Sequence, residues 1–295
     1  MDKGSDDRST SKPPDERRAA GLVIVATPIG NAGDIGLRAL DVLRRADVIA
    51  CEDTRVTGTL MARYGIATPL VAYHEHNAPR MRPVLLARLA RGETIALVSD
   101  AGTPLVSDPG YKLVRAAIDS GLPISAVPGA SAAMVALVTS GLPPDRFLFA
   151  GFLPPRQAAR RAELGELAGV RATLIVFESA GRLAETLADM AVALGPRDAA
   201  VARELTKLHE EVRRGTLADL QAHYAAVPPP KGEIVIVVGP PIAPAAVDDA
   251  TVDAALREAL ETASLRDAVA AVAASLGAPR RRVYARALAL AGGRT

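Results

Sequence analysis

The chain has 295 residues, 49% of them hydrophobic, and its 35 basic and 33 acidic side chains leave a net charge of +2. That length fits two domains of roughly 100–200 residues each, and the composition excludes a disordered, collagen-like or polycationic chain. With one cysteine, Cys51, and four histidines, the chain cannot form an internal disulfide and is poorly suited to a structural zinc site. We therefore expect a protein of a reducing compartment, the cytoplasm, without a bound metal.

The first twenty residues form a separate polar segment. Residues 1–20 mix five acidic with five basic side chains and show no hydrophobic period. This pattern is typical of a disordered tail, and the lack of an apolar core argues against a secretory signal. No apolar run elsewhere approaches the roughly 18–20 residues that a transmembrane helix needs, so we expect no membrane contact.

Between residues 21 and 140, short apolar runs alternate with amphipathic stretches. The runs are nearly continuous in apolar residues, which is typical of parallel strands buried on both faces. This alternation predicts an α/β domain. The expected strands are 22–26, 48–51, 94–98 and 124–127, and the expected helices are 35–45, 83–90, 110–119 and 130–139.

A Gly-Leu-Pro-Pro break at 141–144 predicts a linker into a second α/β domain over residues 141–242. Its expected strands are 147–149, 173–177, 199–202 and 234–238, with helices at 182–193 and 217–224. Residues 251–295 are rich in alanine and leucine and predict a small helical appendage. Its expected helix pair is 265–276 and 280–290, and the stretch from Pro279 onward carries five arginines and no acid.

The common signatures of nucleotide-binding and hydrolytic enzymes are absent from the sequence. No two glycines stand two apart, so there is no G-x-G fingerprint, and no glycine precedes a lysine as in a P-loop. The G-x-S-x-G elbow and the H-E-x-x-H motif are also missing. The sequence therefore lacks the usual signature motifs of dehydrogenases, P-loop NTPases, α/β-hydrolases and zincins.

Three loops after predicted strands are candidates for binding a ligand, because ligands of open α/β sheets bind at the carboxyl ends of strands. Residues 27–31 (TPIGN) could shape a backbone surface, or form an ordinary turn. Residues 99–110 (SDAGTPLVSDPG) make a loop longer than the usual 2–6 residues, in which Asp108 is expected to cap the next helix. Ser131 could line a ligand or cap its own helix.

Charged clusters offer a second set of candidates. Residues 52–55 (EDTR) follow a strand and suit either a reactive cleft or an ion pair beside a helix start. Residues 74–77 (HEHN) are weak as metal ligands because no third ligand accompanies the two histidines. Residues 202–211 (ARELTKLHEE) read as a solvated charged face or as part of a site. Arg280–Arg282 could contact phosphate, since no acid in the local sequence offsets them.

Taken together, these segments resemble the tetrapyrrole methylase superfamily. Within it, the chain is most similar to enzymes that methylate the ribose 2′-hydroxyl of a cytidine in the decoding region of 16S rRNA. The resemblance spans about residues 22–240, and residues 265–290 resemble the helix-turn-helix-like end of that group. The matching segments are TPIGNAGDIGLRAL, CEDTRVTGTL, YHEHN, LVSDAGTPLVSDPGYKLV, VPGASAA, SGLPPDRFLFAGFLP, ARELTKLHEEVRRGTL and KGEIVIVVGP.

The resemblance implies two α/β domains with S-adenosylmethionine in the cleft between them, and a homodimer. The sequence departs from the family pattern at Gly181, where family members commonly have a histidine. Carried over position by position, the methyl-donor pocket would be formed by Pro28, Asp100, Ala101, Gly102, Thr103, Val106, Ser131, Ala132, Phe177, Glu178 and Leu205.

Transfer to a ribose hydroxyl needs alignment with the donor and either a general base or a cation that stabilises the alkoxide. The favoured catalytic residues are Glu52, Asp53, Arg55 and Lys207, with His76 and Glu210 as further candidates. The small ribosomal subunit would be the partner, and its RNA would contact Arg280, Arg281 and Arg282, together with Arg55, Arg156, Arg160 and Arg161.

Two other functions fit the same residues. A methyltransferase for a tetrapyrrole or another small substrate would share the donor loops, but would not need the basic helical appendage. A ribosome-binding protein without catalysis would bind the donor and show no turnover. A purely structural α/β dimer leaves the long 99–110 loop unexplained.

Overall fold

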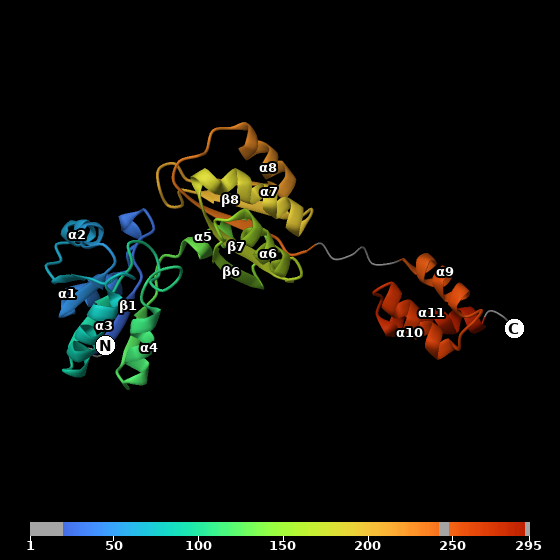
Figure 1. The fold of residues 1–295 in the computed structure, drawn as a ribbon, viewed down its shortest axis with the longest axis horizontal. Helices are drawn as coiled ribbons and strands as arrows, with labels where there is room; N and C mark the ends of the chain where they lie inside the picture. The colour runs from blue at the N-terminus through green and yellow to red at the C-terminus, as the bar shows by residue number, and fades with distance from the viewer. Residues whose placement is uncertain (1–19, 242–247, 293–295) are drawn as a thin grey trace, which may run out of the picture. The chain divides into compact units, whose positions relative to one another are not determined.

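The computed structural model describes residues 20–241 and 248–292 (Figure 1). The chain divides into two compact units, residues 1–241 and 242–295, and each is described by itself. The predicted disordered tail over residues 1–20 lies outside the described residues, apart from Ala20.

The first unit contains two five-stranded sheets, each with one strand more than the four predicted from the sequence. All neighbouring strands of the first sheet run parallel, in the order β3-β2-β4-β1-β5. Strand β3 has only three residues, all of them half-buried, and was not predicted from the sequence. The strands are β1 (Gly21–Val25), β2 (Val48–Cys51), β3 (Leu70–Ala72), β4 (Thr94–Leu97) and β5 (Ile124–Val127).

Helices cover both faces of this sheet. Successive side chains of a strand point to opposite faces, so Val23 packs beside α1 and α2 while Leu22 packs beside α3 and α4. Burial of both faces explains why these strands read as continuous apolar runs. The helices are η1 (Ala32–Asp34, a 3₁₀ turn), α1 (Leu37–Arg45), α2 (Thr54–Arg63), α3 (Ala78–Ala90) and α4 (Tyr111–Asp119).

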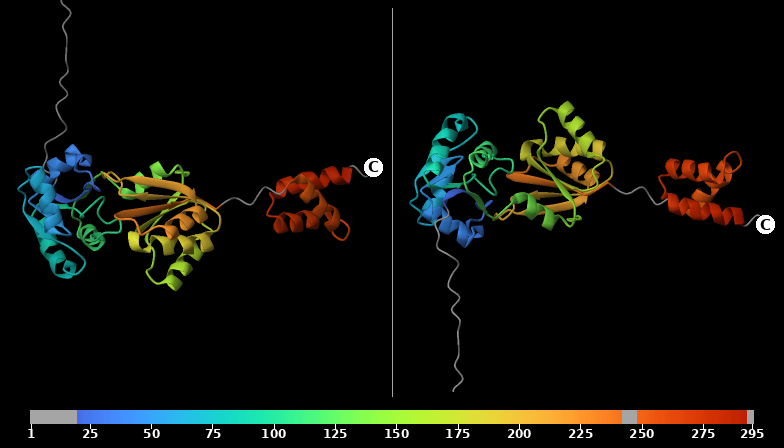
Figure 2. Two further views of the ribbon diagram at one scale, coloured as in Figure 1. Left: turned by 90° about the horizontal axis from the view of Figure 1, so that it is seen from above. Right: turned by 90° about the horizontal axis from the view of Figure 1, so that it is seen from below.

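The second sheet has the order β6-β7-β10-β8-β9 and is mainly antiparallel (Figure 2). Its parallel pair is β6 with β7. The sequence analysis missed β9, an edge strand whose residues are exposed or half-buried and include two arginines. The strands are β6 (Phe147–Phe152), β7 (Thr173–Ser179), β8 (Asp198–Arg203), β9 (Glu211–Thr216) and β10 (Glu233–Val238).

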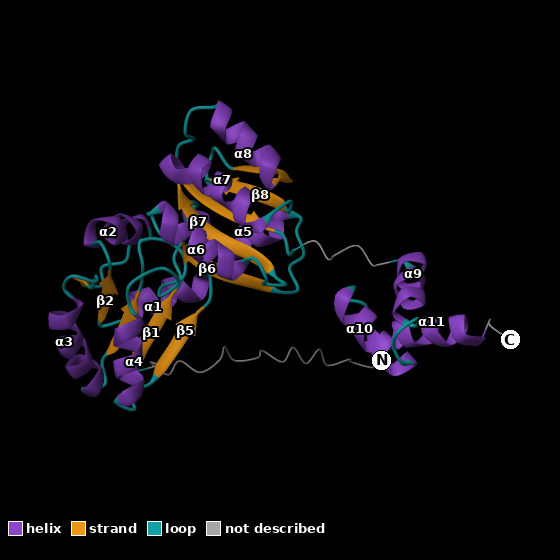
Figure 3. Ribbon diagram, turned by 45° about the vertical axis from the view of Figure 1, so that its right-hand side comes forward, coloured by secondary structure: helices purple, strands orange, loops and turns teal. Residues whose placement is uncertain are grey.

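Helix α5 (Ala132–Ser140) packs on the second sheet, although the sequence analysis grouped it with the first. Its Ala136 and Leu137 join Val235 and Val237 of β10 in one buried cluster. The alternate residues of β10 face three other helices across the sheet (Figure 3). These are α6 (Gln157–Leu167), α7 (Leu183–Leu194), which follows the short turn η2 (Ala180–Arg182), and α8 (Leu217–Ala226).

The second unit is the predicted helical appendage, with helices α9 (Asp249–Ala259), α10 (Leu265–Ser275) and α11 (Arg280–Gly292). Asp248 and Ser264 cap the first two helices by accepting hydrogen bonds from backbone amides of the first turn. A small core of its own holds the three helices together: Val252, Leu256, Val269, Val272, Val283 and Ala287. Among the described helices of the chain, none has the length and apolar character to cross a membrane.

Candidate active site

The loops that follow β1 and β4 meet at the carboxyl edge of the first sheet. Their strands are neighbours, yet α1 lies on one face of the sheet and α4 on the other. This divergence opens the crevice in which α/β sheets bind ligands. The Thr27 amide donates to the Gly102 carbonyl at 2.8 Å, and the Gly102 amide donates back to the Thr27 carbonyl at 3.1 Å. The TPIGN and SDAGTP loops therefore form one backbone platform.

A cavity of about 480 Å³, here called cavity A, lies between this platform and the second sheet. Its volume falls in the range of roughly 300–1,000 Å³ that holds small molecules and cofactors. Apolar side chains such as Ile29, Phe177 and Val235 line it together with the carboxylates of Asp100, Asp108 and Glu233. Cavity A can thus bind a ligand that combines an apolar body with positive charge.

The structure brings nearly all of the predicted donor residues together in cavity A. Pro28 is the exception, because it lines a neighbouring cavity. What these residues bind stays a prediction. The residues in cavity A are Asp100, Ala101, Gly102, Thr103, Val106, Ser131, Ala132, Phe177, Glu178 and Leu205.

The long loop reaches cavity A through unusual backbone conformations. Gly102, Leu105 and Ser107 have φ of 76°, 74° and 64°, in the left-handed region that disfavours side chains. A Cβ at Gly102 would come within 3.3 Å of the Ile29 side chain, so the loop needs glycine there. Strained residues of this kind cluster at functional sites.

Asp108 does not cap the next helix, contrary to the sequence prediction. Gly110 occupies the N-cap position of α4, and no side chain caps it. Asp108 instead lines cavity A, where burial and the nearby charge of Asp100 raise the pKa of its carboxyl. A capping role was predicted for Asp108 because aspartate is a common N-cap residue, whereas the strained loop places Asp108 in the lining of the cavity.

The EDTR loop lies beside the platform but lines neither cavity. The Asp53 amide donates to Asp100 Oδ1 at 3.0 Å, which connects this loop to the cavity wall. Burial, followed by the charges of Asp100, Asp108 and Asp53, raises the pKa of Glu52. Hydrogen bonds from Arg55 lower the pKa of Asp53 to about 2. Glu52 is therefore the better proton acceptor of the two, and Asp53 acts as the cap of α2.

Lys207 lies in a cage of two carboxylates. Its Nζ is 2.9 Å from Glu204 Oε1 and 2.9 Å from Glu233 Oε2. Burial alone would lower the pKa of Lys207, but the hydrogen bonds to Glu204 and Glu233 outweigh it and raise the pKa. Lys207 therefore keeps its proton and serves as a fixed cation, not as a base.

The turn that carries Lys207 is tightly built. Glu204 and Thr206 have φ of 49° and 67°, again in the left-handed region. The Asn31 amide donates to Thr206 Oγ1 at 3.1 Å, and a Cβ at Gly30 would come within 2.4 Å of Lys207 Cγ. The lysine stem thus lies directly on the TPIGN loop, and only glycine leaves room for it.

A second cavity of about 490 Å³, here called cavity B, adjoins the first. It lies between the TPIGN loop, α2 and Lys207, and it contains Pro28. Ile29, Asp100, Ala101 and Glu233 line both cavities. Ligands bound in the two cavities would therefore be neighbours, since the same residues line both cavities.

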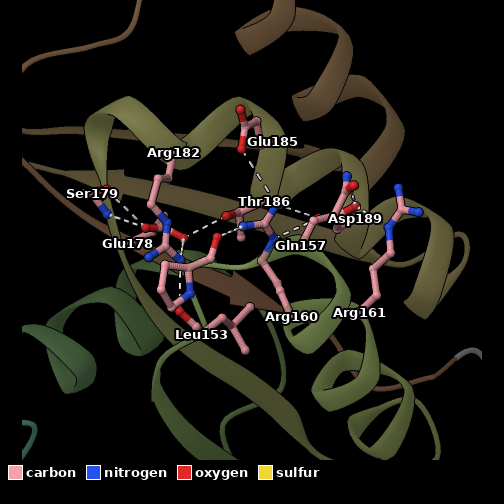
Figure 4. A network of polar contacts seen from close by, with 11 residues as sticks. Leu153, Gln157, Arg160, Arg161, Glu178, Ser179, Arg182, Glu185, Thr186 and Asp189 are labelled. Atoms are coloured by element: carbon pink, nitrogen blue, oxygen red, sulfur yellow. Dashed lines mark hydrogen bonds and ion pairs between the residues drawn. The ribbon is translucent and has the colours of Figure 1, made fainter.

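Two other predicted residues take part in networks inside the protein (Figure 4). The Glu178 carboxylate accepts hydrogen bonds from Arg182, Thr186 and Ser179, so it offers a ligand little unsatisfied charge. Arg160, an expected RNA contact, is only 1% exposed and donates to Asp189 at 2.6–2.7 Å. Its assignment to an RNA surface was wrong, because α6 turns this side chain toward α7.

The two remaining catalytic candidates are placed differently. Glu210 accepts a hydrogen bond from the Thr206 amide at 2.6 Å and so shapes the turn that carries Lys207. His76 lies 6.0 Å from His74, ring centroid to centroid, and lines neither cavity. Over residues 20–241 and 248–292, no three histidine, cysteine or acidic side chains are grouped to hold a metal ion.

In the second unit, acids that are distant in sequence offset part of the arginine patch. Arg282 pairs with Asp249 at 2.7 Å, although the local sequence suggested no acidic partner. Arg286 pairs with Asp253 in the same way. Arg280 and Arg281 are exposed, and within the described part of the chain neither has an ion-pair partner. Of the three arginines predicted to contact RNA, two are therefore without an acidic partner in the described part of the chain, Arg280 and Arg281.

Comparisons with known proteins agree with this architecture. Residues 21–221 match the family model of tetrapyrrole (corrin/porphyrin) methylases, and residues 246–291 match the RsmI C-terminal HTH domain. The chain is also similar in fold to a uroporphyrin-III C-methyltransferase of Thermus thermophilus solved with S-adenyl homocysteine. The TM-score is 0.52 at 20% identity, covering 74% of this chain and 97% of that one.

Two curated relatives are much closer in sequence. Ribosomal RNA small subunit methyltransferase I of Mesorhizobium japonicum is 52% identical over 271 residues, which cover 91% of this chain and 92% of the relative. The protein of the same name from Erythrobacter litoralis is 54% identical over 275 residues, with 93% and 97% coverage. The chain therefore belongs to the tetrapyrrole methylase family and, within it, to the group of ribosomal RNA small subunit methyltransferase I.

Proposed function

We propose that this chain transfers a methyl group from S-adenosylmethionine to the ribose 2′-hydroxyl of a cytidine in the decoding region of 16S rRNA. The observation that carries the proposal is the pair of adjoining cavities that share Ile29, Asp100 and Ala101. A transferase needs its donor and acceptor in contact, because alignment can supply several kcal/mol of the barrier. The names of the two close relatives support ribosomal RNA as the acceptor.

Cavity A suits the donor. S-adenosylmethionine supplies an electrophilic methyl group on a positively charged sulfur. The carboxylates of Asp100 and Asp108 offer opposite charge to the sulfonium and ammonium groups of the donor. Ile29, Phe177 and Val235 offer apolar contacts to its adenosine. Most of the remaining lining is backbone or small side chains, which allows close approach of a ligand.

Lys207 is the best placed of the predicted catalytic residues, because it alone among them lines a cavity. A fixed cation there lowers the energy of the oxyanion that forms as the 2′-hydroxyl loses its proton. Burial and the neighbouring carboxylates raise the pKa of Glu52, which makes its carboxylate a better proton acceptor than that of Asp53, although Glu52 lines neither cavity. Asp53 and Arg55 form an ion pair at 2.6 Å and hold the start of α2 in place.

Exposed side chains support two further partners, the RNA of the small ribosomal subunit and a second copy of the chain. Arg280 and Arg281 of the helical unit offer phosphate contacts, which position an RNA without reading its sequence. The substrate is the small ribosomal subunit, and the enzyme acts in the cytoplasm. A homodimer is supported by α5, whose Val138 is 73% exposed and Met134 37% exposed on an apolar helix.

The test is methyl transfer from labelled S-adenosylmethionine to small ribosomal subunits that lack the modification. The labelled nucleotide is mapped by nuclease digestion and mass spectrometry. We expect label in one 2′-O-methylcytidine of the decoding region. Label in a tetrapyrrole alone would assign a small substrate, and donor binding without any transfer would leave only a binding protein.

A further inference from the structure

We infer that cavity B is the binding site for the target nucleotide and that Arg63 holds a phosphate of that nucleotide. The inference rests on the proposed function and names the acceptor side of the same site. Cavity B adjoins cavity A, yet its lining differs, because α2 contributes one whole wall. That wall consists of Val56, Thr57, Thr59, Leu60 and Arg63.

The wall of α2 has an apolar part and a charged end. Val56, Leu60 and Arg63 are four and three residues apart, which places them along one helical face. Val56 is 45% exposed and Leu60 half-buried, so apolar surface faces the cavity without a protein partner covering it. An apolar strip that ends in a guanidinium matches a nucleoside whose sugar carries a phosphate.

Arg63 is the available charge of cavity B. The other charged lining residues are engaged: Lys207 binds two glutamates, one of them Glu233, and Asp100 accepts from the Asp53 amide. The Arg63 side chain is exposed and makes no ion pair or hydrogen bond with the described part of the chain. Arg63 does not serve the end of its own helix, since Arg44 donates to the Tyr64 carbonyl there. Its guanidinium is therefore free for a ligand.

The shared wall gives this site its place in the reaction. A nucleotide whose phosphate lies at Arg63 would extend across Leu60 toward Asp100 and Lys207. Its ribose would then lie next to cavity A, where the 2′-hydroxyl meets the methyl group of the donor. A guanidinium binds phosphate and carboxylate alike. The experiment must therefore separate an RNA from the carboxylates of a tetrapyrrole.

The first variant is Arg63→Ala, and its matched control is Arg80→Ala, an exposed arginine of α3 with no ion-pair partner in the described chain. Donor affinity, methyl transfer to small subunits, and equilibrium binding of an rRNA fragment are measured at several salt concentrations. For Arg63→Ala we expect unchanged donor affinity, a KM for subunits raised roughly tenfold, and a salt slope smaller by about 1. Arg80→Ala should match the wild type.

A second variant fills cavity B without touching a charge. Thr59 lies on the exposed side of α2, and its hydroxyl bonds only to the Arg55 carbonyl of the same helix. Thr59→Trp should lower transfer at sub-saturating subunit concentration by more than tenfold and leave donor affinity intact. The control is Val84→Trp, which adds a similar bulk at an exposed position of α3 that lines neither cavity and should stay near the wild-type rate.

The outcomes separate the two proposals. Wild-type transfer with equal KM values for Arg63→Ala and Arg80→Ala overturns the nucleotide site and leaves the methyltransferase intact. Weakened donor binding in Arg63→Ala or Thr59→Trp assigns cavity B to the donor instead. If the wild type modifies no RNA, the proposed function fails. In that case, loss of tetrapyrrole binding in Arg63→Ala would show that the site binds carboxylates, and unchanged rRNA-fragment binding would overturn the nucleotide site.

Discussion

Two networks in the second half of the first unit both pair a cation with carboxylates, but one is buried and the other lies beside an open cavity. In one, Arg160 and Asp189 meet at 2.6 Å between α6 and α7, and each side chain is 1% exposed. In the other, Lys207 meets Glu204 and Glu233 at 2.9 Å beside cavity B, with side-chain exposures of 29%, 20% and 75%. The distances are similar, and the networks differ in burial and in their cation, an arginine in one and a lysine in the other.

Burial determines what each network can do. Charges removed from water depend on their partners, because an unpaired buried charge is very costly. Arg160 and Asp189 therefore constrain how α6 packs on α7. Charges that stay beside an open cavity depend less on one another, and their field reaches a ligand. Lys207 thus presents a charge, and Glu204 and Glu233 fix its position.

The largest effect should come from breaking the buried network. Asp189→Ala removes the carboxylate nearest to the buried Arg160 guanidinium and leaves Glu185, at 3.7 Å, as its ion-pair partner, so the free energy of unfolding should fall by about 3–5 kcal/mol. Urea unfolding followed by circular dichroism measures it. The control is the double variant Arg160→Met with Asp189→Leu, which removes both charges and should recover most of the loss. A single variant as stable as the wild type would show that the pair is not buried in solution.

The next effect should be on catalysis alone. Lys207→Ala removes a cation from the wall of cavity B, and we expect kcat to fall by about 10²–10³. The unfolding temperature should change little, because the lysine is partly exposed. Steady-state kinetics with small subunits and a thermal scan measure the two quantities. A loss of stability with unchanged kcat would reverse the roles assigned to the two networks.

The smallest effect should appear in the pH dependence of stability. Burial alone would raise the pKa of Asp189, but hydrogen bonds from Arg161 and Arg160 outweigh it and lower the pKa. A lowered pKa stabilises the fold above the unfolded value of about 3.9, and this contribution is lost as the pH falls through the folded value. The difference in unfolding free energy between wild type and Asp189→Asn should therefore shrink below about pH 4. A constant difference would mean that the charge of Asp189 does not contribute.

The sequence predicted the buried parts of the fold well and the exposed parts poorly. The runs LVIVA, TLIVF and IVIVV became central strands, because strands buried on both faces must be apolar throughout. Strand β9 was missed because an edge strand can carry arginines. Helix α2 was missed because its threonines and glycine have weak helix propensity, and tertiary packing decides such a segment.

The residues of the candidate site were also predicted unevenly. Loops with a distinctive residue pattern led to cavity A, whereas the roles predicted for Arg160 and Asp108 were wrong. Arg160 looked like an RNA contact because its partner lies 29 residues away in sequence. A signal was present: Asp189 falls on the helical stripe of Thr186 and Met190, which are both buried. A carboxylate on an apolar stripe predicts a buried cation elsewhere.

The position of β10 has a consequence for synthesis on the ribosome. β10 is the last strand in sequence, yet it lies in the middle of the second sheet, between β7 and β8. The first sheet has all its strands once Val127 has emerged, whereas α5 ends at Ser140 and gains its β10 contacts only after Glu233. Until then, the apolar side chains of α5, β7 and β8 lack their central neighbour. The second sheet can therefore be completed only after nearly the whole first unit has been translated, whereas all strands of the first sheet are available earlier.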